Sequence, residues 1–335
     1  MMSVAQFGRA LSAALLLCCC SGVAPAAERL NVGLALFPGA TNAPLFLALE
    51  KKWFADAGLD VSIQDGRGSA YSVQVVGAGQ IDVGEAELSP MASALERGAK
   101  VVAIAQMFHK SAMSVIVDRD SGIVGGDGLK GKNIVALAGG PWVQVLDPYF
   151  KRVGLKRDDV NMVFVDGGAI VTTYTSRKAD AMMTTGPWFM PYVDPVRPSR
   201  KFDAADAGIV FPGVGWVVNR DSIESKKAAL TKFVAAQMRA IRYIYDGHED
   251  EAVAAMVAAR PNGKLNTVAL RGQIVAYRDY WKTPATADKP EGWQSAEEWA
   301  DQIKVMEEAG VLKPGRKPAD FFTNEFVDAA EKTLH

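Results

Sequence analysis

The sequence predicts an α/β protein made of two similar lobes, and three observations support this fold class. Strand-like apolar runs alternate with helix-like segments from residue 30 onward, which is typical of mostly parallel sheets covered by helices. The alternation is interrupted by the turn-rich stretch Asp118–Lys132 and then starts again. After Gly213 and Gly215 a strand-like run leads into long helical stretches, so we expect the C-terminal helices to return to the first lobe.

The first series of elements carries recognisable start and stop signals. Its first helix has Thr41 or Asn42 as its cap and Gly58 as its terminator. A turn at Gly66–Ser69 precedes the second helix, and Ser89-Pro90 begins the third. The predicted strands of this series are Leu30–Leu36, Asp60–Gln64, Ile81–Gly84 and Val101–Met107.

The second series repeats this order after the turn-rich stretch. Its predicted strands are Ser114–Val117, Asn133–Leu137, Val160–Val165 and Asp180–Met183, with helices ending near Val153 and Arg177. The strand Trp216–Val218 then leads to a long helix, Lys226–Tyr245. We expect the chain to cross between the lobes near residues 113–118 and 213–218. Lobe 1 would then comprise residues 28–115 and 216–335, and lobe 2 residues 116–215.

The N-terminus has the pattern of a secretory signal peptide over residues 1–27. Arg9 precedes the apolar run Ala10–Cys20, which is too short to span a bilayer, and Ala24-Pro25-Ala26 offers small residues for cleavage near Ala27 or Glu28. Cys18, Cys19 and Cys20 leave lipid anchoring as an alternative, although Leu17 is not the small residue that usually precedes a lipidated cysteine. We therefore expect export to the periplasm and a soluble mature chain.

Composition and motifs argue against several functions. The formal net charge of −1 provides no basic excess for nucleic acid. All three cysteines precede the predicted cleavage, so the mature chain has neither a disulfide nor a cysteine nucleophile. The three histidines, His109, His248 and His335, lack metal-ligand spacing, and no nucleophile elbow or phosphate-binding loop is found. We predict no catalytic residue, no metal and no cofactor.

Candidate binding residues are those in loops at the carboxyl ends of strands, where open α/β sheets bind ligands and helix N-termini favour anions. In lobe 1 they are Phe37, Thr41, Asn42, Arg67, Ser69, Tyr71, Glu85 and Glu87, and in lobe 2 Trp142, Asp166, Thr185 and Trp188, with Trp216 near the second crossing.

Each candidate also has a structural alternative. Thr41 and Asn42 serve equally well as helix caps, and Arg67 either pairs with an anionic ligand or is solvated. Glu85 and Glu87 suit a ligand amine, a partner for Arg67, or an interlobe or capping role. The tryptophans are either plates for a flat ligand or core residues.

Several ordered motifs together carry a family resemblance. Ala43–Ala48, Gly79–Gly84, Ser89-Pro90 and Leu129–Lys132 resemble the taurine, alkanesulfonate and thiamine-pyrimidine-precursor binding family of ABC-transporter solute-binding proteins. The resemblance implies a two-lobed, type II-like periplasmic-binding-protein fold, with two mixed sheets flanked by helices, two crossovers and a ligand between the lobes. One departure is Gly186, which stands where relatives often have an acidic residue.

The expected function is that of the periplasmic solute-binding component of an ABC importer. It would be a monomer that binds a small organic solute, planar or anionic, in the interlobe cleft and docks on a permease in the inner membrane. An enzyme of thiamine-pyrimidine synthesis or cyclic-acid dehydration on the same fold is the alternative, and a sensory ligand-binding domain is a third. The sequence does not name the solute.

Overall fold

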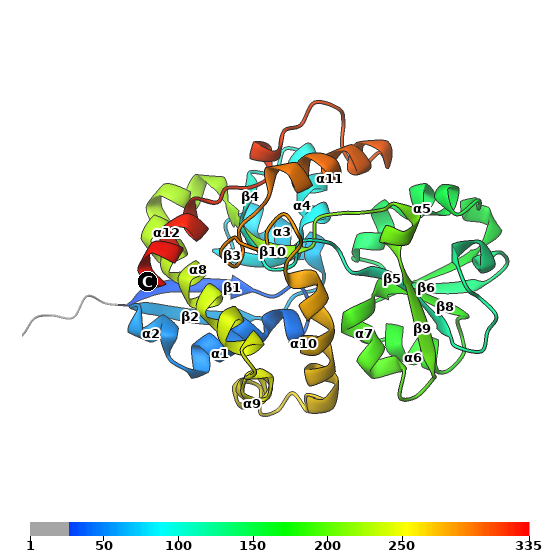
Figure 1. Ribbon diagram of the computed structural model, residues 1–335, viewed down its shortest axis with the longest axis horizontal. Helices are drawn as coiled ribbons and strands as arrows, with labels where there is room; N and C mark the ends of the chain where they lie inside the picture. The colour runs from blue at the N-terminus through cyan, green and yellow to red at the C-terminus, as the bar shows by residue number, and fades with distance from the viewer. Residues whose placement is uncertain (1–26, 335) are drawn as a thin grey trace, which may run out of the picture.

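The computed structural model describes residues 27–334, so nearly all of the predicted signal peptide, with its three cysteines, lies outside the described residues. Two five-stranded sheets form the centres of two lobes (Figure 1). The first sheet has the order β2-β1-β3-β10-β4, with β1 Glu28–Gly33, β2 Leu59–Gln64, β3 Val83–Glu87, β4 Val101–Gln106 and β10 Val214–Asn219.

The second sheet has the order β7-β6-β8-β5-β9 and repeats the plan of the first. Its strands are β5 Met113–Asp118, β6 Asn133–Leu137, β7 Asn161–Val165, β8 Ala181–Thr185 and β9 Ser199–Asp203. In each sheet the strand that enters from the other lobe, β10 or β5, is antiparallel to both of its neighbours. The sheets are therefore mixed, and the predicted fold class is confirmed.

The chain passes between the sheets twice, between β4 and β5 and between β9 and β10. Residues 113–115, expected in lobe 1, lie in β5 of the second sheet, and residues 214–215, expected in lobe 2, lie in β10 of the first. Each crossing thus comes slightly earlier in the chain than the hydrophobic pattern indicates, and the lobe boundaries themselves stay a prediction.

Helices cover the faces of both sheets. Helices from the C-terminal third lie around the first sheet, where α12 lies against α8 and α9 lies against α1 (Figure 1). The helices are α1 Ala43–Glu50, α2 Trp53–Asp56, α3 Ser69–Gly77, α4 Leu88–Glu96, α5 Leu146–Arg152, α6 Ile170–Thr175, α7 Gly186–Val193, α8 Ile223–Tyr245, α9 Glu249–Ala259, α10 Thr267–Trp281, α11 Ala296–Glu308 and α12 Glu325–Leu334.

Helix α10 belongs to the C-terminal third but lies against α7 of the other lobe (Figure 1). At this contact Gly272 packs on Pro191, because a Cβ at Gly272 would lie 3.3 Å from the proline ring. Gln273, fully buried on the same helix, donates from Nε2 to the Trp188 carbonyl at 2.6 Å and accepts from the Ala40 amide at 3.0 Å. This one side chain therefore joins both lobes.

Three local predictions need correction. The first predicted helix is two helices, because Lys52 adopts a left-handed backbone (φ 59°) between α1 and α2. Strand β3 continues to Glu87, so Glu85 and Glu87 lie within the strand and not in a loop beyond it. Strand β9 was not expected, because its sequence SRKFD is charged and lacks an apolar run.

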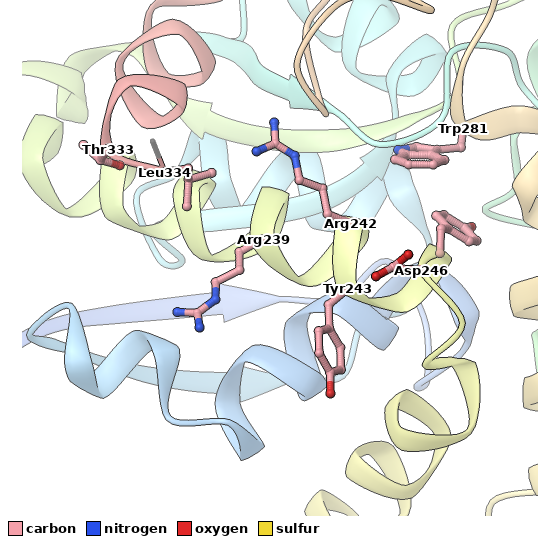
Figure 2. Close-up of a pocket in the computed structure, with 8 residues that line it drawn as sticks. Arg239, Arg242, Tyr243, Asp246, Trp281, Thr333 and Leu334 are labelled. Atoms are coloured by element: carbon pink, nitrogen blue, oxygen red, sulfur yellow. The ribbon is translucent and has the colours of Figure 1, made fainter.

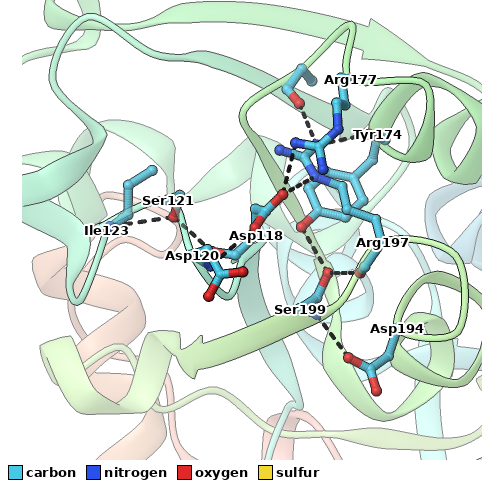
Figure 3. Close-up of polar contacts among 10 residues, drawn as sticks. Asp118, Asp120, Ser121, Ile123, Tyr174, Arg177, Asp194, Arg197 and Ser199 are labelled. Carbon is cyan, nitrogen blue, oxygen red and sulfur yellow. Dashed lines mark hydrogen bonds and ion pairs between the residues drawn. The ribbon is translucent and has the colours of Figure 1, made fainter.

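Lobe 2 contains a buried ion-pair network, shown in Figure 3. Asp118, at the end of β5, accepts from Arg197 Nε at 3.1 Å, from Arg177 Nη1 at 2.9 Å and from the Asp120 amide at 3.0 Å. Arg197 is 5% exposed and lies over the Tyr174 ring, and its Nη1 donates to two backbone carbonyls. Both buried charges are thus partnered from several sides.

Within residues 27–334, no helix has both the length and the apolar character that crossing a membrane requires.

Candidate functional site

A cavity of about 430 Å³ lies between the two sheets. Lobe 1 lines it with residues that follow β1 and β2, together with Glu85 and Glu87 of β3. Lobe 2 lines it with residues that follow β6, β7 and β8. The carboxyl ends of strands from both sheets therefore meet at one pocket, as expected for ligand sites in open α/β sheets.

Small residues allow the two lobes to touch around this pocket. Gly68 has φ 121°, and a Cβ there would come within 3.0 Å of the Gly139 carbonyl oxygen in the opposite lobe. A Cβ at Gly39 would lie 2.2 Å from the Trp188 ring, closer than any side chain allows. A larger residue at either glycine would hold the lobes apart, so the glycines permit the close approach.

Aromatic side chains form one wall. Trp188, at the start of α7, meets Phe37 of the loop after β1 edge to face, with ring centroids 5.8 Å apart. Trp188 is 6% exposed, and its Nε1 is buried without a hydrogen-bond partner among the described residues. Its backbone carbonyl accepts a hydrogen bond from Gln273, so the start of α7 is anchored to α10.

Two acidic side chains lie on the lobe 1 side. Glu85 and Glu87 are two positions apart on β3, so both side chains leave the same face of the strand. They are 1% and 6% exposed, and both line the cavity. Oε2 of Glu85 accepts from the Ala35 amide at 2.9 Å and from Asn42 Nδ2 at 2.6 Å.

One oxygen of each carboxyl is open. Oε1 of Glu85 and Oε2 of Glu87 are buried with no hydrogen-bond partner among the described residues. The hydroxyls of Thr41 and Ser111 lie near enough to lower the pKa values of Glu85 and Glu87, respectively. Neither hydroxyl, however, has the geometry of a hydrogen bond to a carboxyl oxygen. The pair thus retains capacity to accept hydrogen bonds from another group.

Burial favours the neutral form of these carboxyls. It raises the pKa of Glu87 to about 8, against a lowering effect of the Ser111 hydroxyl, and the charge of Glu85 adds a further, smaller increase. Burial also raises the pKa of Glu85, against the lowering effect of its hydrogen bonds. Tyr277 of α10 lines the same cavity, and burial together with the two glutamates keeps its pKa well above the ordinary value.

The remaining polar candidates in the cavity play different parts. Ser69 Oγ accepts from the Glu87 amide at 3.0 Å and so fixes the end of β3 against α3. Arg67 is exposed and lies over the Tyr71 ring, 5.6 Å from its centroid, and it forms no ion pair with Glu85 or Glu87 in this structure. Asp166 is exposed and turned to its own loop, where Oδ1 accepts from the Gly168 amide.

Nine of the thirteen predicted residues line this cavity: Phe37, Thr41, Arg67, Ser69, Glu85, Glu87, Asp166, Thr185 and Trp188. Four predicted residues lie elsewhere. Asn42 is fully buried and supports Glu85, while Tyr71 is 39% exposed on α3. Trp142 and Trp216 are core residues.

The two core tryptophans are held by packing, although Nε1 of Trp216 has no hydrogen-bond partner among the described residues. Trp142 is 1% exposed and donates from Nε1 to the Thr184 carbonyl at 2.8 Å. Trp216 is fully buried in β10 and packs edge to face on Phe233 of α8. Loop position alone did not distinguish Trp142 from Trp188, because their environment comes from strands distant in sequence.

Sequence reasoning also missed several lining residues, chiefly Tyr277, Phe189 and Val214. Tyr277 comes from α10, where the sequence shows only an amphipathic helix without a motif. Gly186, noted for its departure from relatives, does not line the cavity. A Cβ there would lie 2.4 Å from Ser114 Oγ, so an acidic side chain has no room at this position.

A second depression of about 820 Å³ lies on the surface of lobe 1, between α8 and the end of the chain (Figure 2). Arg242 on its floor is paired with Glu291 and Glu331, and Arg239 lies over the Trp53 ring. It is wide open, contains none of the predicted residues and lies away from the strand ends.

The comparisons with known proteins agree with this architecture. A "Putative thiamine biosynthesis protein" of Haemophilus influenzae is 23% identical over 86% of this chain and 89% of its own length. A 4-amino-5-hydroxymethyl-2-methylpyrimidine phosphate synthase of Saccharomyces cerevisiae is 28% identical over 38% of this chain, and the chain matches 37% of that protein's length.

Among solved structures, the alkanesulfonate-binding protein SsuA of Xanthomonas axonopodis has the same fold. Its TM-score is 0.68 at 15% identity, with 88% of this chain and 98% of that chain covered. The family profile described as "NMT1/THI5 like" matches residues 40–252, which is more than half of the chain. The resemblance drawn from the sequence motifs is confirmed, and the chain belongs to the NMT1/THI5-like family.

Proposed function

We propose that this protein is the periplasmic solute-binding component of an ABC importer. It captures one small, flat organic solute between its lobes as a monomer and presents the closed form to a permease in the inner membrane. The observation that carries this proposal is the cavity itself: it is formed by strand ends from both sheets, has an aromatic wall and is closed by glycine contacts between the lobes.

The residues that line the pocket favour a planar solute over an anionic one. Trp188 and Phe37 provide extended apolar surface, and the two buried carboxyls outnumber the one exposed arginine. Among the described residues, the one basic side chain that an anion such as a sulfonate could meet in this lining is Arg67, which lies over the Tyr71 ring. A flat solute is therefore the better fit.

An enzyme is the second candidate, and one observation favours it. A glutamic acid with a pKa of about 8 is suited to proton transfer near neutral pH, and the yeast relative is named as a synthase. Incubation of the protein with the solute it retains, followed by mass spectrometry, separates the two functions. Unchanged solute supports capture, and a new product supports catalysis.

The binding function is tested at Trp188. Native mass spectrometry of the purified protein identifies a retained solute, and a thermal-shift panel ranks related compounds, since a ligand of the folded state raises stability. We expect Trp188→Ala to weaken binding of the best compound about tenfold or more, because it removes the pocket wall. Trp53→Ala, on the far side of lobe 1, is the matched control and should leave affinity unchanged. Equal affinity in wild type and Trp188→Ala would overturn the assignment of the pocket.

A further inference from the structure

We propose that the captured solute is a flat nitrogen cation that donates N–H hydrogen bonds to the open oxygens of Glu85 and Glu87. This inference rests on the proposed function, because it names the class of molecule that the same pocket takes. It goes further in assigning the charge, the donor pattern and the side chains that select them.

The first step is the position of the two carboxyls. Both side chains leave one face of β3 into the cavity, and both are more than nine-tenths buried. A strand fixes the spacing of alternate side chains, so the two acceptors are held at a constant separation. The two carboxyls thus offer acceptors at two points of one wall, which suits a molecule that carries more than one N–H donor, such as an amidine or a protonated heterocycle.

The second step is that the described residues leave one oxygen of each carboxyl without a hydrogen-bond partner. Asn42 and the Ala35 amide satisfy Oε2 of Glu85, and the Glu87 amide is satisfied by Ser69. Oε1 of Glu85 and Oε2 of Glu87 have no hydrogen-bond partner in residues 27–334. Buried polar atoms without partners are costly, so their persistence at a cavity wall points to a group that arrives with the solute.

The third step is the charge around the pair. Glu85 faces Glu87 from the same strand, Tyr277 approaches from α10, and Asp166 lines the opposite side. Arg67 is the only basic residue of the lining, and it lies over Tyr71 and not beside the carboxyls. Once the pair gives up its proton it becomes negatively charged with no basic group beside it among the described residues, and a cation stabilises that charge whereas an anion does not.

The fourth step is the aromatic wall. Trp188 and Phe37 border the same cavity, and a flat cation gains from contact with an aromatic face as well as from burial. Nε1 of Trp188, also buried without a partner among the described residues, is a donor that an acceptor atom of the solute can meet. A planar molecule with N–H donors on one edge and an acceptor on another would satisfy all three open atoms.

Protonation gives this assignment a signature of its own. Because burial raises the pKa of Glu87, the empty pair holds a proton at neutral pH. A cation binds best to the ionised pair, so it must displace that proton, and its affinity should rise with pH up to about 8. A neutral or anionic solute would not displace a proton from this pair.

Three probes of the same size test the charge: benzamidine, benzamide and benzoate. We expect benzamidine to raise the melting temperature of the wild-type protein, benzamide to have a smaller effect and benzoate to have none. Benzamidine keeps its charge between pH 6 and 8, so its affinity should increase about tenfold or more over this range through the protein alone. Stabilisation by benzoate alone, or by none of the three compounds, overturns the assignment.

Variants locate the effect. Glu87→Gln should weaken benzamidine binding about tenfold or more and remove its dependence on pH, and Glu85→Gln should weaken binding as well. Glu96→Gln is the matched control, because that carboxyl pairs with Arg316 outside the cavity. Wild-type affinity and pH dependence in Glu87→Gln would contradict the proposal, and this variant is expected to fold because the native carboxyl is itself protonated.

Failure of this inference can be distinguished from failure of the binding function. A retained anionic solute whose binding is lost in Trp188→Ala would leave capture intact and overturn the cation. A retained cation whose binding is unaffected by Trp188→Ala but lost in Glu87→Gln would support the acidic pair and contradict the aromatic wall.

Discussion

Asp118 in lobe 2 and Glu87 in lobe 1 are both buried carboxyls at the end of a strand, but their surroundings shift their pKa values in opposite directions. Asp118 has two arginines and a backbone amide as partners (Figure 3), and these hydrogen bonds, the amide of Asp120 first, lower its pKa. Glu87 has no basic partner among the described residues, and burial raises its pKa to about 8.

The difference separates structure from function. A buried charge whose acceptors are all used holds one packing arrangement and offers nothing to a ligand. A buried carboxyl with an unused oxygen at a cavity wall destabilises the empty protein and is suited to recognition or chemistry. In this chain the first kind lies within lobe 2, and the second faces the gap between the lobes.

The largest expected effect concerns the pH dependence of stability. The pKa of Glu87 rises on folding from its ordinary value of 4.5 to about 8, so the folded state binds the extra proton across this window. The free energy of unfolding therefore falls as pH rises through the window, by up to about 1.4 kcal/mol per pH unit from this group. Glu87→Gln should remove that slope and make the ligand-free protein more stable than wild type at pH 8.

Urea unfolding at pH 5, 6.5 and 8 measures this effect. The contribution of Glu87 is fully present below pH 4.5 and lost as pH approaches 8, so the gain in the variant should grow with pH. A variant less stable than wild type at pH 8 would show that the carboxylate is partnered after all, and the contrast with Asp118 would fail.

Asp118→Ala should lower the free energy of unfolding, whereas Glu87→Gln should raise it at pH 8. It leaves Arg197, which is 5% exposed, without a counter-charge, and breaking a buried pair from one side costs about 3 kcal/mol. The loss is expected in urea unfolding at neutral pH, with no change in the affinity for benzamidine, because none of the network lines the cavity. As a control, Arg119→Ala removes a largely exposed ion pair with Asp194 and should cost under about 1 kcal/mol. Equal losses of stability in both variants would show that the buried network contributes no more than an exposed ion pair.

The sequence predicts part of the candidate site. The rule that ligands bind at strand ends selected the loops that contain most of the candidate residues. It could not show that β3 continues through Glu87, because acidic residues are unfavourable in strands unless tertiary contacts support them. Only the fold supplies those contacts, here from Ser69 and Asn42.

Contacts between segments that are distant in the sequence could not be predicted either, because only the fold brings those segments together. Trp142 and Trp188 have the same kind of loop position, yet the first donates to Thr184 within the core and the second faces the cavity. Gln273 and Tyr277 reach the site from α10, far along the chain, and no local pattern marks them. The sequence predicts which ends of the strands meet, whereas packing decides which side chains reach the ligand.

The smallest expected effect is at Arg67. If the carboxyl pair truly lacks a basic partner, Arg67→Met should change the free energy of unfolding by no more than about 0.5 kcal/mol, as at other exposed positions. The same variant should bind benzamidine at least as tightly as wild type, because a like charge at the rim has been removed. The measurement is the same urea titration together with the benzamidine thermal shift. A stability loss at pH 8 that disappears in the Glu87→Gln background would show that Arg67 turns inward to neutralise the pair, which would make lobe 1 resemble the Asp118 network and reverse the sign of the solute's charge.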